Sequence, residues 1–204
     1  DLRGFSERDI VQLPSRELVM ADVVGVSRGY EQRRLAALDE LTEAHFAVAS
    51  VQAAAQRTMP PEALKAAIVS LATGETAPLD ELAQSLTRAG YERCVQVEGT
   101  GQFSIRGGIL DVFPPQAEHP YRVEFWDDEI DSISTFDVGS QRRLEQCECL
   151  RCLPCMESIP ALAKGGAAGL AKAVLALTST RRKKQHADLQ ANLERDAERL
   201  RETG

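Results

Sequence analysis

The segment Phe103–Pro115, FSIRGGILDVFPP, constrains the fold more than any other part of the sequence. Apolar and polar residues alternate over Gln102–Arg106 and again over Ile109–Phe113, which is the period of a β-strand with one buried face. The pair Gly107–Gly108 interrupts the alternation, and paired glycines inside a strand typically mark a bulge or a sharp bend. We therefore predict a bent strand that presents Arg106 to solvent.

The residues around this segment predict a compact α+β domain over 75–150. Leu79–Ala89 has an apolar stripe at helical spacing, and Gly90 follows where a left-handed C-cap is expected. The turn Trp126–Glu129 separates two alternating runs, which predicts a β-hairpin. The strand-like runs are Tyr91–Val97, Tyr121–Phe125 and Ile130–Phe136.

The section before this domain, residues 1–74, alternates strand-like and helical runs. Ile10–Leu13 is short and β-prone, Tyr30–Leu41 has leucines on one helical side, and His45–Val51 has the composition of a buried parallel strand. This alternation predicts an α/β layer. The section after the domain, residues 151–204, is Ala-rich and then charged with helical spacing, so we expect helices there.

The charge and hydropathy of the chain argue against a protein that binds DNA over its whole surface and against a membrane-spanning protein. The formal net charge is −7, and an acidic chain attracts DNA phosphates only through a local basic patch. Acidity suits a module that docks onto a basic partner, and it also serves solubility. The longest apolar-rich stretch, Ala161–Leu177, is interrupted by Lys164 and Lys172, so we expect no membrane span.

The ends and the cysteines of the chain indicate its setting. The sequence has no initiator Met and a strand-like run begins at Ile10, so we expect a piece of a longer protein. No secretory signal is visible, and the five cysteines are an odd number. We therefore expect reduced thiols and a cytoplasmic location.

Residues 91–145 resemble the interaction domain that UvrB shares with the bacterial transcription-repair coupling factor (Mfd). Similarity extends less specifically over nearly the whole chain, through Leu13–Pro14 and Phe46–Gln52. The blocks that carry the resemblance are Tyr91–Arg93, Phe103–Pro115, Tyr121–Phe125 and Asp128–Asp137. Within this family, Gly107–Leu110 and Ser140–Leu144 have the form found in the coupling factor rather than in UvrB.

The resemblance implies a fold and a role. Residues 1–74 would be part of a RecA-like α/β layer, 75–150 an inserted interaction domain, and 151–204 a helical return segment of the first layer. The interaction domain would dock onto UvrA, the damage-sensing ATPase of nucleotide excision repair. The longer protein would be an ATP- and Mg-dependent DNA translocase that displaces stalled RNA polymerase. Its contacts with RNA polymerase and DNA would lie in other parts, so this chain is expected to be no enzyme and to hold no cofactor.

The resemblance also carries over partner-binding residues. Arg93 and Arg106 match two basic docking positions of the family, and Ser104 falls where UvrB has a third arginine. Phe103 could supply apolar contact area or belong to the core. From the residues alone, Arg106 could instead be a surface arginine paired with Asp111 or Glu124.

An enzymatic interpretation lacks a site. The sequence has no G-x-x-x-x-G-K-[ST] phosphate loop. The carboxylates of Asp127–Glu129 are typical of a solvated turn, although they could bind a metal ion. His45, His119 and His186 are scattered along the chain and have no evident partner for nucleophilic chemistry.

Four cysteines, Cys147, Cys149, Cys152 and Cys155, have spacings that zinc ligands can show. The first two alternate along a run that the resemblance implies is a β-strand, where they would face the core together. Core packing is therefore the favoured interpretation, with a zinc site or a redox switch as alternatives. The fifth cysteine, Cys94, is expected to be buried in a strand.

The rival to a protein-docking module is a DNA-binding or helicase-like fragment of a UvrB relative. The basic run Arg181–Lys184 could contact nucleic-acid phosphates, or it could be a solvated helix face. UvrB inserts a Tyr-rich hairpin after its first strand, whereas residues 14–44 contain one tyrosine, Tyr30. This difference favours the docking module.

Overall fold

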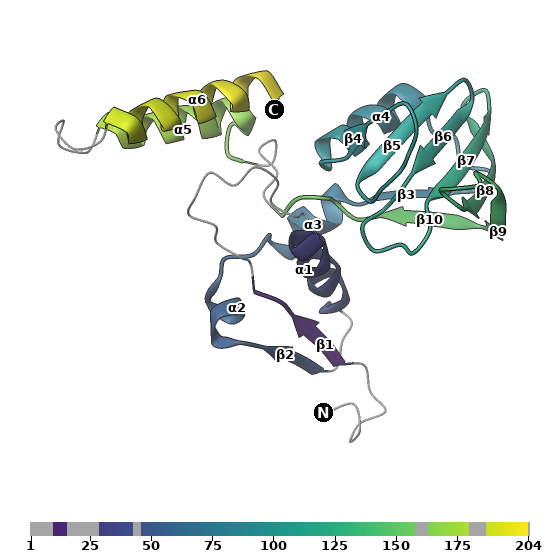
Figure 1. The fold of residues 1–204 in the computed structure, drawn as a ribbon, viewed down its shortest axis with the longest axis horizontal. Helices are drawn as coiled ribbons and strands as arrows, with labels where there is room; N and C mark the ends of the chain where they lie inside the picture. The colour runs from purple at the N-terminus through teal and green to yellow at the C-terminus, as the bar shows by residue number, and fades with distance from the viewer. Residues whose placement is uncertain (1–9, 16–28, 43–45, 158–162, 180–186, 204) are drawn as a thin grey trace. The chain divides into compact units, whose positions relative to one another are not determined.

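In the computed structural model, the described residues combine helices with three small sheets (Figure 1). The chain forms two compact units, residues 1–157 and 158–204. The structure describes residues 10–15, 29–42, 46–157, 163–179 and 187–203.

The first unit opens with strand and helix in alternation, as the sequence predicts. Strand β1 (Ile10–Leu13) pairs in parallel with β2 (Phe46–Ala49). Three helices belong to the same section: α1 (Gly29–Glu40), α2 (Val51–Ala55) and α3 (Pro61–Ala67). Ser50 caps the N-terminus of α2, because its side chain accepts a hydrogen bond from the backbone N–H of Ala53. Helix α3 begins at a proline, which suits the first helical turn.

The prediction that the second strand is buried is wrong, because all four residues of β2 are exposed. A parallel strand is buried where helices or further strands cover both faces of its sheet. The described residues leave β2 uncovered, so its apolar side chains, including Phe46 and Val48, face solvent.

The centre of the first unit is a six-stranded sheet in the order β4-β5-β6-β7-β8-β9. Strands β4 and β5 are parallel, and each later pair is antiparallel. The strands are β4 (Glu92–Arg93), β5 (Gln102–Arg106), β6 (Ile109–Val112), β7 (Tyr121–Trp126), β8 (Glu129–Phe136) and β9 (Arg143–Cys147). The predicted hairpin of β7 and β8 is confirmed, whereas the long strand predicted at 91–97 is reduced to the two residues of β4.

The glycine pair connects two strands instead of bending one. Strands β5 and β6 are antiparallel neighbours joined by Gly107 and Gly108, so the predicted bent strand is a β-hairpin. Gly107 has φ +59°, whereas Gly108 has no positive φ, which is the pattern of a type II′ turn. A Cβ at Gly108 would lie 3.1 Å from the carbonyl oxygen of Phe125, so the backbone passes close to β7 at this point.

A two-stranded ribbon joins the beginning of the central domain to its end. Strand β3 (Val69–Ala72), which the sequence analysis did not predict, pairs in antiparallel fashion with β10 (Cys149–Cys152). Val69 lies opposite Cys152, and Leu71 lies opposite Leu150. The pairing joins segments far apart in the sequence, so no local pattern indicates it.

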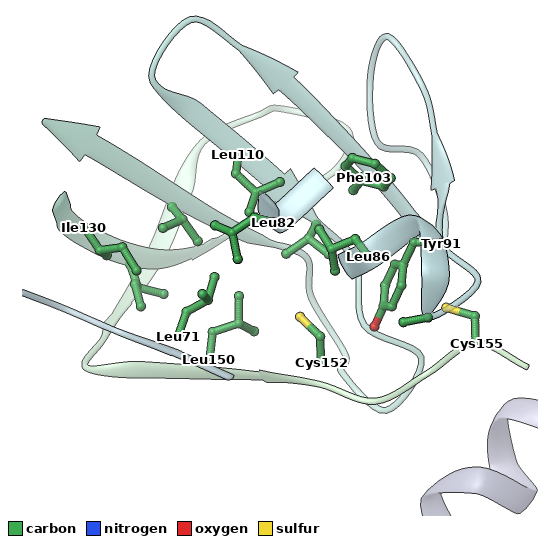
Figure 2. Packing of buried hydrophobic residues seen from close by; sticks show 14 residues of the cluster. Leu71, Leu82, Leu86, Tyr91, Phe103, Leu110, Ile130, Leu150, Cys152 and Cys155 are labelled. Atoms are coloured by element: carbon green, nitrogen blue, oxygen red, sulfur yellow. The ribbon is translucent and has the colours of Figure 1, made fainter. Parts of the chain in front are cut away.

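The hydrophobic core lies between the central sheet, helix α4 (Leu79–Arg88) and the β3–β10 ribbon (Figure 2). Leu82 and Leu86 of α4 point toward Phe103 and Leu110 of the sheet, and further members of the cluster come from the ribbon. Burial of these apolar side chains is the main stabilising contribution to the domain.

Helix α4 ends as the sequence predicts. The N–H of Gly90 donates to the carbonyl oxygen of Thr87, and the N–H of Tyr91 donates to that of Leu86, which together form a Schellman motif. Gly90 has φ +90°, a conformation that residues with a side chain rarely adopt. The Tyr91 hydroxyl then donates to the carbonyl oxygen of Leu153 at 2.7 Å, so the helix end is anchored in the core.

The described residues of the second unit form two helices, α5 (Gly166–Ser179) and α6 (Ala187–Thr203), which pack against each other. In the described part of the chain, none of the helices is long and apolar enough to cross a membrane.

We predict that Gly90→Ala lowers the free energy of unfolding by about 1–2 kcal/mol, because a Cβ is disfavoured at positive φ. The new methyl group would also lie 2.9 Å from Cε of Met156. Thermal unfolding followed by circular dichroism measures the loss. Gly99→Ala is the matched control, since Gly99 has no positive φ and a Cβ there would meet nothing within 4 Å. Equal melting temperatures for the two variants would contradict this account of the helix end.

Candidate partner-binding site

Arg106 lies at the end of β5, immediately before the Gly107–Gly108 turn, and half of its side chain is exposed (49%). Its Nη2 donates to Oδ2 of Asp111 at 2.7 Å, across the hairpin. One of the two pairings considered for Arg106 from the sequence is therefore present. The remaining donors of the guanidinium are available to a partner, because the ion pair uses only one edge of the group.

Alternation along the strands divides the sheet into two faces. Phe103, Leu110 and Val123 point into the core, so their neighbours in the chain point to the opposite face. We name this opposite face the arginine face. It carries Ser104, Arg106, Asp111, Arg122 and Glu124.

Asp111 is the centre of the arginine face. Its carboxylate is almost fully buried (1% exposed) and is held between two guanidinium groups. Oδ1 accepts from Nε of Arg122 at 2.7 Å, and Oδ2 accepts from Nη2 of Arg122 at 2.8 Å in addition to Arg106. A carboxylate with three charge-assisted hydrogen bonds holds both arginine side chains in a fixed geometry.

The Arg122 guanidinium contacts both oxygens of this carboxylate. Its guanidinium stacks on the ring of Phe136, with Cζ 4.5 Å from the ring centroid, and it donates to the side-chain oxygen of Gln141 at 3.1 Å. The hydrogen bond with Asp111 raises the pKa of Arg122 further above its usual value. Sequence analysis missed Arg122. The sequence signal that could have found Arg122 was its polar position in the alternating run of β7. In the register of β6 and β7, this position lies opposite Asp111.

Two of the predicted partner-binding residues are buried. Phe103 is fully buried in the core, and Ser104 is 1% exposed on the arginine face. Within the described residues, the hydroxyls of Ser104 and Ser134 have no hydrogen-bond partner, and these serines lie on either side of Asp111 and Arg122 in one cross-strand row. Neither Phe103 nor Ser104 presents surface to a partner in this structure.

A second ion pair lies beside the first on the arginine face. Glu124 accepts from Nη2 of Arg143 at 2.7 Å and from the Ser132 hydroxyl at 2.8 Å. These contacts, the Ser132 hydrogen bond first, lower the pKa of the Glu124 carboxyl. This pair is more exposed than the Asp111 centre.

Arg93 lies on β4, the edge strand next to β5, so the two predicted arginines are on neighbouring strands, as expected. The register places Arg93 opposite Phe103, and alternation therefore assigns it to the other face from Arg106. Arg93 is exposed and forms no ion pair with any residue that the structure describes. A partner that contacts both arginines would therefore have to bind around the β4 edge.

The cysteines do not gather on one strand. Cys147 ends β9, and Cys149 begins β10, which belongs to another sheet. The prediction that Cys147 and Cys149 face the core side by side is wrong, because Cys149 is exposed while Cys147 is partly buried. Cys152 and Cys155 lie in the hydrophobic core next to Tyr91 (Figure 2). No group of three or more Cys, His, Asp or Glu residues suited to a metal ion occurs in the described ranges.

The other chemical groups singled out from the sequence lie apart from this site or outside the described residues. Asp127 and Asp128 form the β7–β8 turn, Glu129 begins β8, and Asp127 has φ +57°. His45, His186 and the basic run Arg181–Lys184 lie outside the residues whose structure is described.

Comparison with known proteins gives a consistent assignment. Residues 69–157 match the family model described as the UvrB interaction domain. The transcription-repair-coupling factor of Bacillus subtilis is 35% identical over 97% of this chain and 17% of its own length. Those of Haemophilus influenzae and Escherichia coli are each 33% identical, over 76% and 77% of this chain and 14% of their own lengths. The chain thus spans only 14–17% of the length of these curated relatives.

The fold and the match define the central domain, from β3 to the residues after β10, as a UvrB interaction domain. The similarity continues on both sides of that domain in the Bacillus subtilis protein. The chain belongs to the transcription-repair-coupling factor family, of which it forms the UvrB-homologous region.

We predict that Asp111→Asn destabilises the domain by about 1–3 kcal/mol, because it leaves two guanidinium groups without their carboxylate. Both arginines retain some access to water, which limits the loss. Chemical denaturation gives the value. Glu124→Gln removes a carboxylate from the same face and is the control. It should cost about 0.5 kcal/mol, since that ion pair is exposed. A loss for Asp111→Asn no greater than for the control would refute the central role of Asp111.

Thiol reactivity provides a separate test of the cysteine positions. Burial raises the pKa of the Cys152 thiol to about 12, so at pH 8 this group is almost entirely protonated and does not react. Exposed Cys149 should react with Ellman's reagent in the native protein, whereas Cys152 should react only after unfolding. Mass spectrometry after partial labelling identifies the modified residue. Rapid labelling of Cys152 in the folded chain would contradict this packing.

Proposed function

We propose that this chain recruits UvrA, and that the surface around Arg106 is where UvrA binds. The observation that supports this function is the geometry of Arg106, which is half exposed and held by a buried carboxylate at a sheet turn. Arginine is enriched at the energetic centres of protein interfaces, because its planar group of donors matches a carboxylate. A guanidinium that is already oriented loses little side-chain entropy when a partner binds.

The proposed partner group is a carboxylate on UvrA that meets the free edge of the Arg106 guanidinium. Arg93 would provide a second contact at the β4 edge, where it is exposed. An ion pair that becomes desolvated at such an interface typically costs 2–5 kcal/mol on truncation, partly because the partner's charge is left unpaired. The two arginines therefore have to be tested one at a time.

The wider role that we propose is that of the whole protein. The β1–β2 sheet with α1 to α3 would be part of a RecA-like layer, and the α5–α6 pair a helical segment that returns to that layer. The longer protein would be a cytoplasmic, ATP- and Mg-dependent DNA translocase that displaces stalled RNA polymerase. This chain would then contribute recruitment of UvrA without ATP hydrolysis of its own.

We predict that the chain binds purified UvrA in a calorimetric titration, and that Arg106→Ala weakens binding at least tenfold, about 1.4 kcal/mol. Arg93→Ala should weaken it as well, because its charge is lost at the neighbouring edge. Arg88→Ala, which removes an exposed arginine from α4, is the matched control and should leave the affinity unchanged. Melting temperatures show whether each variant is folded. The proposal fails if the folded chain does not bind UvrA, or if Arg106→Ala behaves like Arg88→Ala.

A further inference from the structure

Trp126 is the single tryptophan of the chain, and 81% of it is exposed. It ends β7, directly before the turn to β8. Large aromatic side chains stabilise a domain when they are buried, so an exposed tryptophan contributes little to this fold. Tryptophan is also among the residues most enriched at the energetic centres of interfaces.

The position of Trp126 in the sheet relates it to Arg106. Phe125 packs against the core, so alternation along β7 assigns Trp126 to the arginine face, together with Arg122 and Glu124. The backbone N–H of Phe125 donates to the carbonyl oxygen of Gly108 at 2.8 Å, which brings the end of β7 beside the turn that follows Arg106. Two strand spacings, about 10 Å, separate β5 from β7.

We propose that Trp126 is a partner-binding residue, and that the UvrA-docking surface extends from Arg106 across the arginine face to Trp126. This inference rests on the proposed function and adds a second anchor to it. A typical stable interface covers about 800 Å² on each partner, so residues two strands apart on one face of a sheet lie within one interface. The surface then combines a cation held by Asp111 with a large apolar side chain.

The charges around these residues specify the chemistry of the partner. On the arginine face, Arg106, Arg122 and Arg143 accompany two carboxylates, so one positive charge is left over in a chain whose net charge is −7. Beyond Trp126 the sign reverses at the acidic turn Asp127–Glu129. The complementary surface would carry a carboxylate opposite Arg106, an apolar pocket for the indole ring and a basic group opposite the turn. Such a pattern of charges fixes the orientation of docking as well as its affinity.

The test uses the full chain and purified UvrA. Trp126→Ala should weaken binding at least tenfold without a change in melting temperature, because the exposed ring contributes little to folding. Trp126→Phe, which keeps an aromatic ring, should recover part of the affinity. Tyr30→Ala is the matched control, because it removes a half-exposed aromatic ring from α1, which is far in the sequence from the turns of the central sheet. This variant should leave the affinity unchanged.

A second measurement reports on Trp126 directly. Incorporation of 5-fluorotryptophan gives one fluorine nucleus, and its NMR signal should shift or broaden when UvrA is added. The same addition to Arg106→Ala at equal concentration should have a much smaller effect. A signal that does not change when the chain is saturated with UvrA overturns the inference.

The outcomes separate this inference from the proposed function. If Arg106→Ala loses affinity while Trp126→Ala stays within twofold of the unaltered chain, docking at Arg106 stands and the role of Trp126 is refuted. If the folded, unaltered chain does not bind UvrA, both proposals are refuted together. Loss of affinity in both variants, with an unaffected Tyr30→Ala control, supports both.

Discussion

The Asp111 carboxylate, buried between two guanidinium groups, determines the arrangement of the face opposite the core. Removing a carboxylate from water is costly unless opposite charges and hydrogen bonds replace its hydration. Arg106 and Arg122 supply these contacts from the strands on either side of the carboxylate. The same interaction joins three strands and orients the arginine that the proposed function requires, so stability and recognition depend on one group.

The two faces of the central sheet illustrate how different physical effects share one element. On the core side, apolar side chains from α4 and the β3–β10 ribbon exclude water without regard to direction. On the arginine face, hydrogen bonds and ion pairs have defined geometry, and Phe136 supplies the flat surface on which Arg122 lies. A surface organised in this way presents its charges in fixed positions, which is a requirement for specific binding.

Features with a local cause were predictable from the sequence. The end of α4 at Gly90 and the β7–β8 hairpin depend on residues close together in the chain, and both were predicted correctly. The pairing of β3 with β10 was not predictable, because Val69 and Cys152 meet only after the rest of the domain has folded between them. The exposure of Cys149 depends on the same long-range pairing, since that pairing begins a new strand two residues after Cys147.

The candidate site was predictable in part, and for a related reason. The pattern of Phe103–Pro115 indicated a bent strand that presents Arg106. The structure has a hairpin there instead, and it places that arginine half exposed. The pattern did not show that Ser104, on the face opposite the core, is buried. Alternation indicates that two faces exist, whereas the residues that cover each face are decided by tertiary packing.

The pairing of β3 with β10 also determines how easily this domain can be inserted into another fold. Because Val69 lies opposite Cys152, the chain enters and leaves the domain at adjoining positions. To a host fold, the whole domain then resembles an enlarged loop whose two ends are as close as those of a hairpin. Such a domain can be inserted into, or exchanged between, unrelated scaffolds with little distortion of the host backbone. A domain with this architecture is portable, because a host fold needs only two adjoining backbone ends to accommodate it.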